Sequence, residues 1–273
     1  MYLKVPCGKC VKCKQRRSRQ WIFRLKQENR ASENSYFVTL TYDDENLVWA
    51  DSGVPTLCKS DFQRYIKRLR KAQAKVSGLK LRYFACGEYG SKTFRPHYHA
   101  LLFNVVPDLI EKSWSIDGKP IGLVHIGNVT EDSIAYNTKY IMKSNCEYQE
   151  QFMEDRSFQR EFALMSKGIG KVYSDSREVR QYHNKIMENC VRDEKGYITP
   201  LPRYYKDKIF DEEAREELRK NTVFEAKKLD VEQFFKEIKQ DNEGGKPYKD
   251  KIARQQYEDY IVYKRLTNKN SKL

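Results

Sequence analysis

The sequence of 273 residues predicts an α+β fold, in which helices cover a central antiparallel β-sheet. Three observations carry this prediction. Segments rich in β-branched and aromatic residues indicate strands, and segments of 3.6-residue periodicity indicate helices. Their order along the chain is strand, helix, strand, strand, strand, helix, which suits the α+β class.

The expected elements follow from local patterns. Residues 1–34 should contain a helix with a short apolar face, and Ser60-Asp61 should open another helix with an apolar stripe. The strands are expected at 35–42, 80–88, around His97–His99 and at 121–126. The apolar stripes are Trp21, Ile22 and Leu25 in the first helix and Phe62, Tyr65, Ile66 and Leu69 in the second.

The chain divides into three predicted regions: a cysteine-rich basic segment at 1–34, a core at 35–150 and a mostly helical, charged region at 151–273. Acidic and basic residues alternate over 206–241, as in a solvated helix. A last helix is expected from about Tyr248, after Gly244-Gly245.

The composition favours a polyanionic partner. The formal net charge is +14, and aromatic residues make up 13% of the chain. Positive charge mixed with aromatic rings suits single-stranded nucleic acid, because bases stack on rings and cations follow the phosphates. No apolar run has the length of a membrane helix, and the start lacks a signal-peptide core. Seven cysteines, an odd number, argue against a disulfide framework and for a cytosolic protein.

The segment Arg95-Pro96-His97-Tyr98-His99-Ala100-Leu101 is the most informative motif. Residues i and i+2 of a strand point to the same face, so His97 and His99 should lie side by side, with Tyr98 on the opposite face. Two neighbouring imidazoles can hold one divalent metal ion. The alternative is an ordinary strand that contains two polar residues.

A helix after Thr130-Glu131-Asp132-Ser133 carries two tyrosines one turn apart. Thr130 suits a helix start, and the acids complement the positive end of the helix dipole. On a helical wheel, one stripe is apolar and can pack on a sheet. The opposite stripe should present its phenols and lysines, although tyrosines at this spacing often only cover a core. This stripe contains Tyr136, Lys139, Tyr140 and Lys143.

Cysteines and basic residues are concentrated near the start of the chain. Three thiolates at the spacing of Cys7, Cys10 and Cys13 can hold zinc if a fourth ligand comes from elsewhere; the alternative is a basic DNA-contacting arm with reduced cysteines. Candidates for the fourth ligand are Cys58, Cys86, His125, His183 and Cys190. The residues expected to bind DNA are Arg16, Arg17, Arg19, Arg64, Lys67, Arg68, Lys71 and Lys143.

Together these segments resemble the HUH endonucleases that start rolling-circle replication, and within them the initiators of gokushovirus-type single-stranded-DNA phages of the Microviridae. The resemblance covers residues 6–205, and 206–273 only loosely. It implies the HUH fold, with about five antiparallel strands and flanking helices. It rests on Pro6-Cys7-Gly8-Lys9-Cys10, Phe37-Val38-Thr39-Leu40-Thr41-Tyr42, Gly87-Glu88-Tyr89-Gly90, Arg95-Pro96-His97-Tyr98-His99, the helix from Tyr136 to Lys143, Ser166 to Gly170 and Pro202-Arg203-Tyr204-Tyr205.

The resemblance also implies roles for individual residues. His97 and His99 would be metal ligands with Glu88 as the third, and Mg²⁺ or Mn²⁺ suits carboxylate and imidazole donors. The two nucleophiles would be Tyr136 and Tyr140, with Lys139 beside them. One departure is that Asn137 and Thr138 replace a small apolar pair often found in the family; both are expected on the flank or the packed side of the helix.

The function implied is that of a phage replication initiator, which nicks single-stranded DNA at the origin, forms a 5′-phosphotyrosine and religates the strand. It would act in the cytoplasm of the bacterial host, away from membranes. Since the sequence contains no Gly-x-x-x-x-Gly-Lys-Ser/Thr loop, a host helicase and polymerase would assist. The alternatives are a transposase or plasmid relaxase with the same chemistry, and a non-catalytic, zinc-containing nucleic-acid-binding protein.

Overall fold

The computed structural model describes residues 7–139, 151–152, 154–192 and 198–221. The chain forms two compact units: Arg17–Lys171, and Met1–Arg16 together with Val172–Leu273. The first unit contains the main sheet. The described part of the second contains short helices and a small β-hairpin.

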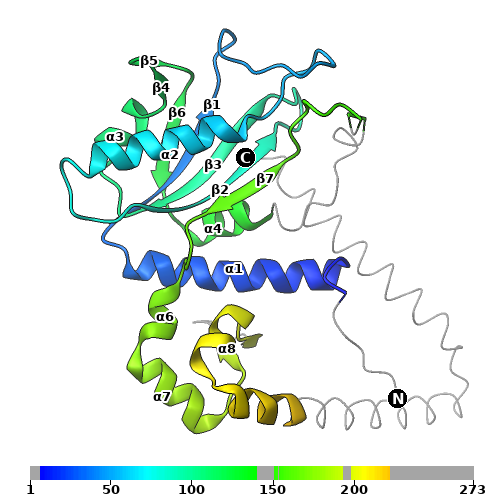
Figure 1. The fold of residues 1–273 in the computed structure, drawn as a ribbon, viewed down its shortest axis with the longest axis vertical. Helices are drawn as coiled ribbons and strands as arrows, with labels where there is room; N and C mark the ends of the chain where they lie inside the picture. Colours follow the sequence, from blue (N-terminus) through cyan, green and yellow to red (C-terminus); the bar gives the residue numbers. More distant parts are fainter. Residues whose placement is uncertain (1–6, 140–150, 153, 193–197, 222–273) are drawn as a thin grey trace, which may run out of the picture. The chain divides into compact units, whose positions relative to one another are not determined.

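The main sheet has five antiparallel strands in the order β6-β1-β3-β2-β7 (Figure 1). Strand β3 is therefore central, with β1 on one side and β2 on the other. The predicted α+β class with a central antiparallel sheet is confirmed. The strands are β1 Ser35–Thr41, β2 Arg82–Tyr89, β3 Pro96–Phe103, β6 Val124–Asn128 and β7 Phe162–Met165.

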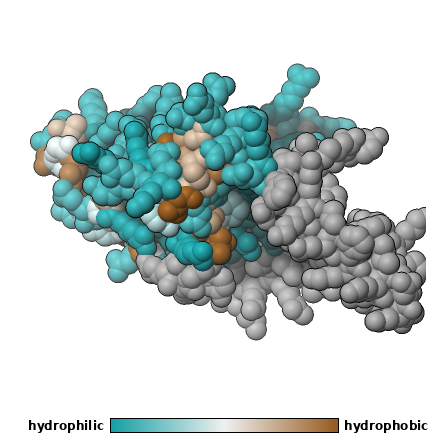
Figure 2. Space-filling model, turned by 90° about the horizontal axis from the view of Figure 1, so that it is seen from below, coloured by the Kyte–Doolittle hydropathy of each residue, from teal (hydrophilic) through white to brown (hydrophobic). Residues whose placement is uncertain are grey.

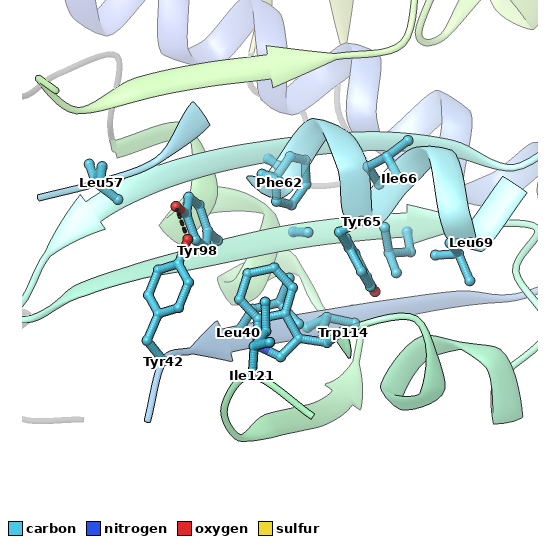
Figure 3. Packing of buried hydrophobic residues seen from close by; sticks show 14 of the residues in the cluster. Leu40, Tyr42, Leu57, Phe62, Tyr65, Ile66, Leu69, Tyr98, Trp114 and Ile121 are labelled. Atoms are coloured by element: carbon cyan, nitrogen blue, oxygen red, sulfur yellow. Dashed lines mark hydrogen bonds between the residues drawn. The ribbon is translucent and has the colours of Figure 1, made fainter. Parts of the chain in front are cut away.

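Helix α2, Lys59–Gln73, covers one face of the sheet, with the short helix α3, Asp108–Lys112, beside it (Figure 1). The predicted apolar stripe of α2 is buried, because its hydrophobic side chains recur at the helical period. Figure 3 shows this stripe packed with Leu40, Tyr98 and Trp114. This cluster is the larger of the hydrophobic cores among the described residues. The stripe consists of Phe62, Tyr65, Ile66 and Leu69.

Helices α1, Val11–Ala31, and α4, Glu131–Thr138, lie on the opposite face. Leu25 of α1 and Ile134 of α4 pack with Phe84 and other apolar residues of β2 and β3. The buried carboxylate of Glu28 pairs with Arg82 of β2. Polar contacts at their edges therefore fix these helices on the sheet, in addition to apolar packing.

A hairpin precedes the edge strand β6. It consists of β4, Ser115–Ile116, and β5, Lys119–Pro120. Gly122 follows with φ of +157°, and a Cβ there would lie 1.9 Å from the carbonyl oxygen of Thr41. Glycine is thus needed where the chain passes close to the end of β1 before it pairs as β6.

The second unit has its own small core. Its elements are α6 Lys171–Asp175, α7 Arg177–Ile186, the hairpin of β8 Cys190–Arg192 and β9 Ile198–Pro200, and α8 Arg203–Ile209. His183 is fully buried there, with Nε2 2.9 Å from the Tyr173 hydroxyl and Nδ1 3.0 Å from the Glu188 carbonyl oxygen. Both ring nitrogens have partners, so His183 serves this core.

The expectation that the chain turns helical from about residue 150 is wrong for β7, β8 and β9. These strands are three or four residues long, too short to show a periodicity. The helix expected over 206–241 is seen only in part: α8 ends at Ile209, residues 212–221 are helical, and the rest, with the helix from Tyr248, lies outside the described residues. The three-region division stays a prediction, although α1 and β7 both pack within the sheet unit.

The described surface reflects the charged composition. Figure 2 shows a face that is mainly hydrophilic, with small hydrophobic patches between charged and polar side chains. In the part of the chain that the structure describes, none of the helices combines the length and apolar character needed to cross a bilayer.

Candidate active site

Strand β3 presents His97 and His99 on the sheet face that carries α1 and α4. In the register of the sheet, Glu88 of β2 lies directly opposite His97. Directly paired residues point to the same face, so the carboxylate and both imidazoles come together. One ligand atom from each of these three residues lies within 4.8 Å of the other two. This is the spacing of groups that share one metal ion.

The members of this cluster differ in exposure. The side chains of Glu88 and His99 are 4% and 8% exposed, whereas His97 is half-buried. The opening of the site is therefore on the His97 side. A cation bound among these groups would offset the cost of keeping a carboxylate away from water, so the burial of Glu88 suits a metal site.

Hydrogen bonds on the far side of each ring fix the orientation of the imidazoles. The Nδ1 atom of His97 lies 3.1 Å from the carbonyl oxygen of Arg95, which can only accept, so this nitrogen carries the proton of the bond. The Nδ1 atom of His99 lies 3.0 Å from the hydroxyl oxygen of Thr39. Both Nε2 atoms are thereby directed to the cluster, in the arrangement typical of metal-binding histidines.

Helix α4 brings a phenol to the same place. Thr130 caps the helix in a capping box with Ser133, which sets where its turns begin. The hydroxyl oxygen of Tyr136 then lies 3.3 Å from Nε2 of His99. The Nζ atom of Lys139 lies 4.8 Å from the centre of the Tyr136 ring, at cation–π distance.

The inner side of α4 is polar where it meets the sheet. Asn137 is fully buried, and the thiol of Cys86 lies 3.3 Å from its side-chain oxygen and 3.5 Å from Oε1 of Glu88. Thr138, also fully buried, accepts a hydrogen bond of 3.2 Å from Ser18 of α1. As expected, Asn137 and Thr138 lie on the packed side.

On the opposite face, Tyr98 anchors the same stretch of β3. Its hydroxyl donates to the carbonyl oxygen of Cys58 and accepts from the amide of that residue, each at 2.9 Å. It also lies 2.9 Å from the hydroxyl of Tyr42, as the dashed line in Figure 3 shows. Burial raises the pKa of Tyr98 and Tyr42 above the ordinary phenol value, so both stay protonated and structural.

Two other predicted residues of the site cannot be placed. Tyr140 and Lys143 lie outside the described residues, so the expected pairing of Tyr136 with a second tyrosine stays a prediction.

The cysteine segment lies in the other unit. One sulfur atom each of Cys7, Cys10 and Cys13 lies within 4.8 Å of the others, and the group has three members among the residues described. Backbone N–H groups of Cys10 and Lys9 lower the pKa of the Cys7 thiol to about 7. The proposed fourth ligands have other partners: Cys86 contacts Asn137, Cys190 contacts Glu188, and the remaining candidates do not join the group.

The predicted DNA-binding residues that the structure describes lie on two helices. Arg16, Arg17 and Arg19 are exposed on α1. The basic side chains of α2 lie across the sheet from the cluster, because α2 packs on the Tyr98 face. Among them, Arg64 pairs with Asp61 and Arg68 donates to the carbonyl oxygen of Ser113, whereas Lys67 and Lys71 are exposed.

Known proteins decide the family. A family model described as replication-associated protein ORF2 matches residues 35–145. Replication-associated protein ORF2 of Spiroplasma virus 4 is 30% identical over 247 residues, which make up 81% of this chain and 76% of that protein. The chain belongs to this family of replication-associated proteins. The predicted resemblance to phage replication proteins is thus confirmed.

Two further relatives of this replication-associated protein come from other phages. Replication-associated protein VP4 of Bdellovibrio phage phiMH2K is 30% identical over 74% of this chain and 66% of its own length. Replication-associated protein ORF4 of Chlamydia phage 1 is 27% identical over 85% of this chain and 62% of its own length. No solved structure matches the chain.

Sequence reasoning missed the groups that support the cluster. Thr39, Cys86 and the carbonyl group of Arg95 touch its members but carry no motif of their own. Thr39 and Cys86 both stand opposite His99 in the sheet, so the strand register was the signal that could have found them. That register is not visible in one sequence.

Proposed function

We propose that this replication-associated protein is an HUH-type endonuclease and strand-joining enzyme, which nicks single-stranded DNA at the origin to start rolling-circle replication. The observation that supports the proposal most directly is the meeting of a phenol with two imidazoles and a carboxylate: the Tyr136 hydroxyl is 3.3 Å from His99 Nε2, within the Glu88, His97 and His99 cluster. The names of the phage relatives support a role in replication.

The donor set fits a divalent cation. Two imidazoles with tethered Nδ1 atoms and one buried carboxylate would hold Mn²⁺ or Mg²⁺, both of which accept oxygen ligands readily. Bound there, the ion would polarise the scissile phosphate and stabilise the charge that develops in the transition state.

The side chains of α4 would carry out the transfer. The phenolic oxygen of Tyr136 attacks phosphorus and forms a phosphotyrosine bond, while the bond to the 3′-oxygen breaks. The phenolic proton passes to solvent, and the departing oxygen becomes a 3′-hydroxyl. A phenol with a pKa of about 10 is mostly protonated at neutral pH, and the nearby charge of Lys139 favours the phenolate.

The covalent intermediate would also permit rejoining. The phosphotyrosine bond keeps the energy of the phosphodiester, so attack by a 3′-hydroxyl reseals the strand and regenerates the phenol. Tyr140, one helical turn after Tyr136 in sequence, would cut the newly made strand while Tyr136 holds the first end. Unwinding and synthesis in the bacterial cytoplasm would fall to a host helicase and a host polymerase.

The test uses single-stranded oligonucleotides that together cover the circular genome of the phage, each with a label at its 3′ end. Incubation with the full-length protein and Mn²⁺ or Mg²⁺ should transfer the label of one oligonucleotide to the protein, as seen on a denaturing gel. Chelation should prevent the transfer. If the protein binds the DNA but no oligonucleotide ever gives an adduct, the proposal is wrong and the protein is a non-catalytic binder.

A further inference from the structure

A second group of potential metal ligands lies apart from the Glu88, His97 and His99 cluster. Cys7 and Cys10 precede α1, and Cys13 lies in its first turns. The sulfur atoms of Cys7 and Cys13 are 3.9 Å apart, and that of Cys10 completes a group within 4.8 Å. Three thiols from seven consecutive residues therefore converge on one point.

The backbone is shaped for this convergence. Gly8 has φ of +73°, a left-handed conformation that glycine adopts without strain, and it reverses the chain after Cys7. The amide of Cys10 then donates to the sulfur of Cys7 at 3.2 Å. Cys10 and Cys13 are three residues apart at the start of the helix, so their side chains lie on the same side. The turn and the helix thus bring sulfur atoms together from two directions.

We propose that Cys7, Cys10 and Cys13 bind one zinc ion through their three sulfur atoms. A tetrahedral site with zinc–sulfur bonds of about 2.3 Å has sulfur–sulfur edges of roughly 3.8 Å. The separation of 3.9 Å between Cys7 and Cys13 matches that edge. The fourth position of the tetrahedron is open to water or to a further ligand.

The identity of the ion follows from the donors. Soft thiolates select zinc over Mg²⁺ or Mn²⁺, whereas the carboxylate and imidazoles of the sheet cluster suit the harder ions. An iron–sulfur cluster binds its cysteines to separate iron atoms, and so holds the sulfur atoms farther apart than a mononuclear ion does. The close spacing therefore favours one zinc ion.

A bound ion would also explain how this segment keeps its bend. Residues 7–10 are all exposed, so burial of apolar surface does not hold the turn. In small exposed segments a metal ion can supply the stabilisation that a hydrophobic core supplies elsewhere. Zinc here would fix the start of α1 and the direction of the basic side chains that follow Cys13.

The experiment measures metal in the purified full-length protein by mass spectrometry after dialysis without chelator. We expect about one zinc per chain, and a loss of most of it in Cys10→Ser and in Cys7→Ser. Cys58→Ser is the matched control and should keep its zinc, because that thiol lies beside Ser60 at the start of α2. His97→Ala should also keep it, since the other cluster is separate.

Two measurements on the wild-type protein guard against misfolded variants. Substitution with Co²⁺ should give a thiolate charge-transfer band in the near ultraviolet, which histidine and carboxylate ligands do not produce. Zinc should protect Cys7, Cys10 and Cys13 from alkylation, whereas Cys190 should react equally with and without it.

Several results would overturn the proposal. These are zinc content that the cysteine variants leave unchanged, a Co²⁺ derivative without the thiolate band, or a native preparation whose thiol-bound metal is copper or an iron–sulfur cluster. The nicking activity is read separately, so failure of this proposal would leave the proposed function standing, and the reverse is also true.

Discussion

Hydroxyl groups serve opposite purposes on the two faces of β3. Tyr98 points into the α2 core, where burial raises its pKa and three hydrogen bonds hold it. Tyr136 approaches the same strand from α4 and is only half-buried, with its hydroxyl near His99. The environment of each phenol therefore separates a structural tyrosine from a candidate nucleophile, although the sequence shows both as tyrosines near histidines.

The sharpest prediction concerns the two helix tyrosines. Tyr136→Phe and Tyr140→Phe should each leave some covalent adduct, because the other phenol can use the same metal site. The double variant should form no adduct yet bind DNA normally, since phenylalanine keeps the ring. Mass spectrometry of the trapped peptide measures which residue carries the nucleotide.

The control for this series is Tyr182→Phe, in which an exposed tyrosine of α7 loses its hydroxyl. This variant should form adduct like the wild type. A nucleotide linked to neither Tyr136 nor Tyr140 would show that the nucleophiles are assigned wrongly.

Asn137 is predicted to act as a positioning residue. Its side-chain oxygen faces the Cys86 thiol, which in turn faces Glu88. Asn137→Leu keeps the volume but removes this acceptor, so the Mn²⁺ concentration for half-maximal adduct formation should rise about 10-fold, as for other groups that orient metal ligands. Titration of adduct formation with Mn²⁺ measures the change.

Thr138→Val provides the matched comparison for Asn137→Leu. It removes the acceptor of the Ser18 hydrogen bond and should cost roughly 1 kcal/mol of stability. The Mn²⁺ dependence should stay as in the wild type. Equal shifts in the two variants would mean that Asn137 acts through the general packing of α4 and not through Glu88.

At the scale of elements, the two faces of the sheet separate chemistry from the basic surface of α2. Lys67 and Lys71 are exposed on that helix, across the sheet from the cluster. If they contact phosphates, Lys67→Gln with Lys71→Gln should weaken DNA binding and lower the log–log salt slope by about one unit per lost contact. The rate of adduct formation at saturating DNA should not change.

Lys119→Gln in the β4–β5 hairpin serves as the charge-matched control for this pair. Fluorescence anisotropy across a range of salt concentrations gives the slope for each variant. A slope identical to that of the wild type in the α2 variant would remove α2 from the DNA-binding surface.

Long elements were predictable because periodicity accumulates over their length. The α2 stripe and the alternation of His97, Tyr98 and His99 determined which side chains face which layer. β7 was missed because Phe162–Met165 is a short edge strand in a charged region. The supporting contacts of Thr39, Cys86 and Asn137 were missed for another reason: they depend on strand register and helix docking, which are tertiary properties.

For the whole molecule, the buried tyrosines predict how stability depends on pH. Burial raises the pKa values of Tyr42, Tyr65 and Tyr98 in the folded state. The folded protein therefore holds these protons more tightly than the unfolded chain does, and this contribution is complete below the ordinary phenol pKa of about 10. The free energy of unfolding in urea should fall as pH rises above that value.

Tyr42→Phe should make this alkaline decline shallower, because it removes one of the titrating groups. Tyr182→Phe should leave it unchanged, since that hydroxyl is on the surface. A free energy of unfolding that stays constant from about pH 9 to pH 11 would contradict the prediction.

The alternation within β3 limits how this protein can vary over generations. A substitution between Pro96 and Phe103 alters one side chain, but an inserted or deleted residue would turn both imidazoles into the α2 core and push Tyr98 out to the opposite side. Lineages can therefore lengthen or shorten the stretch between β1 and α2 far more freely than this strand. A library designed to change the specificity of the protein should accordingly diversify loop length there and hold the length of β3 constant.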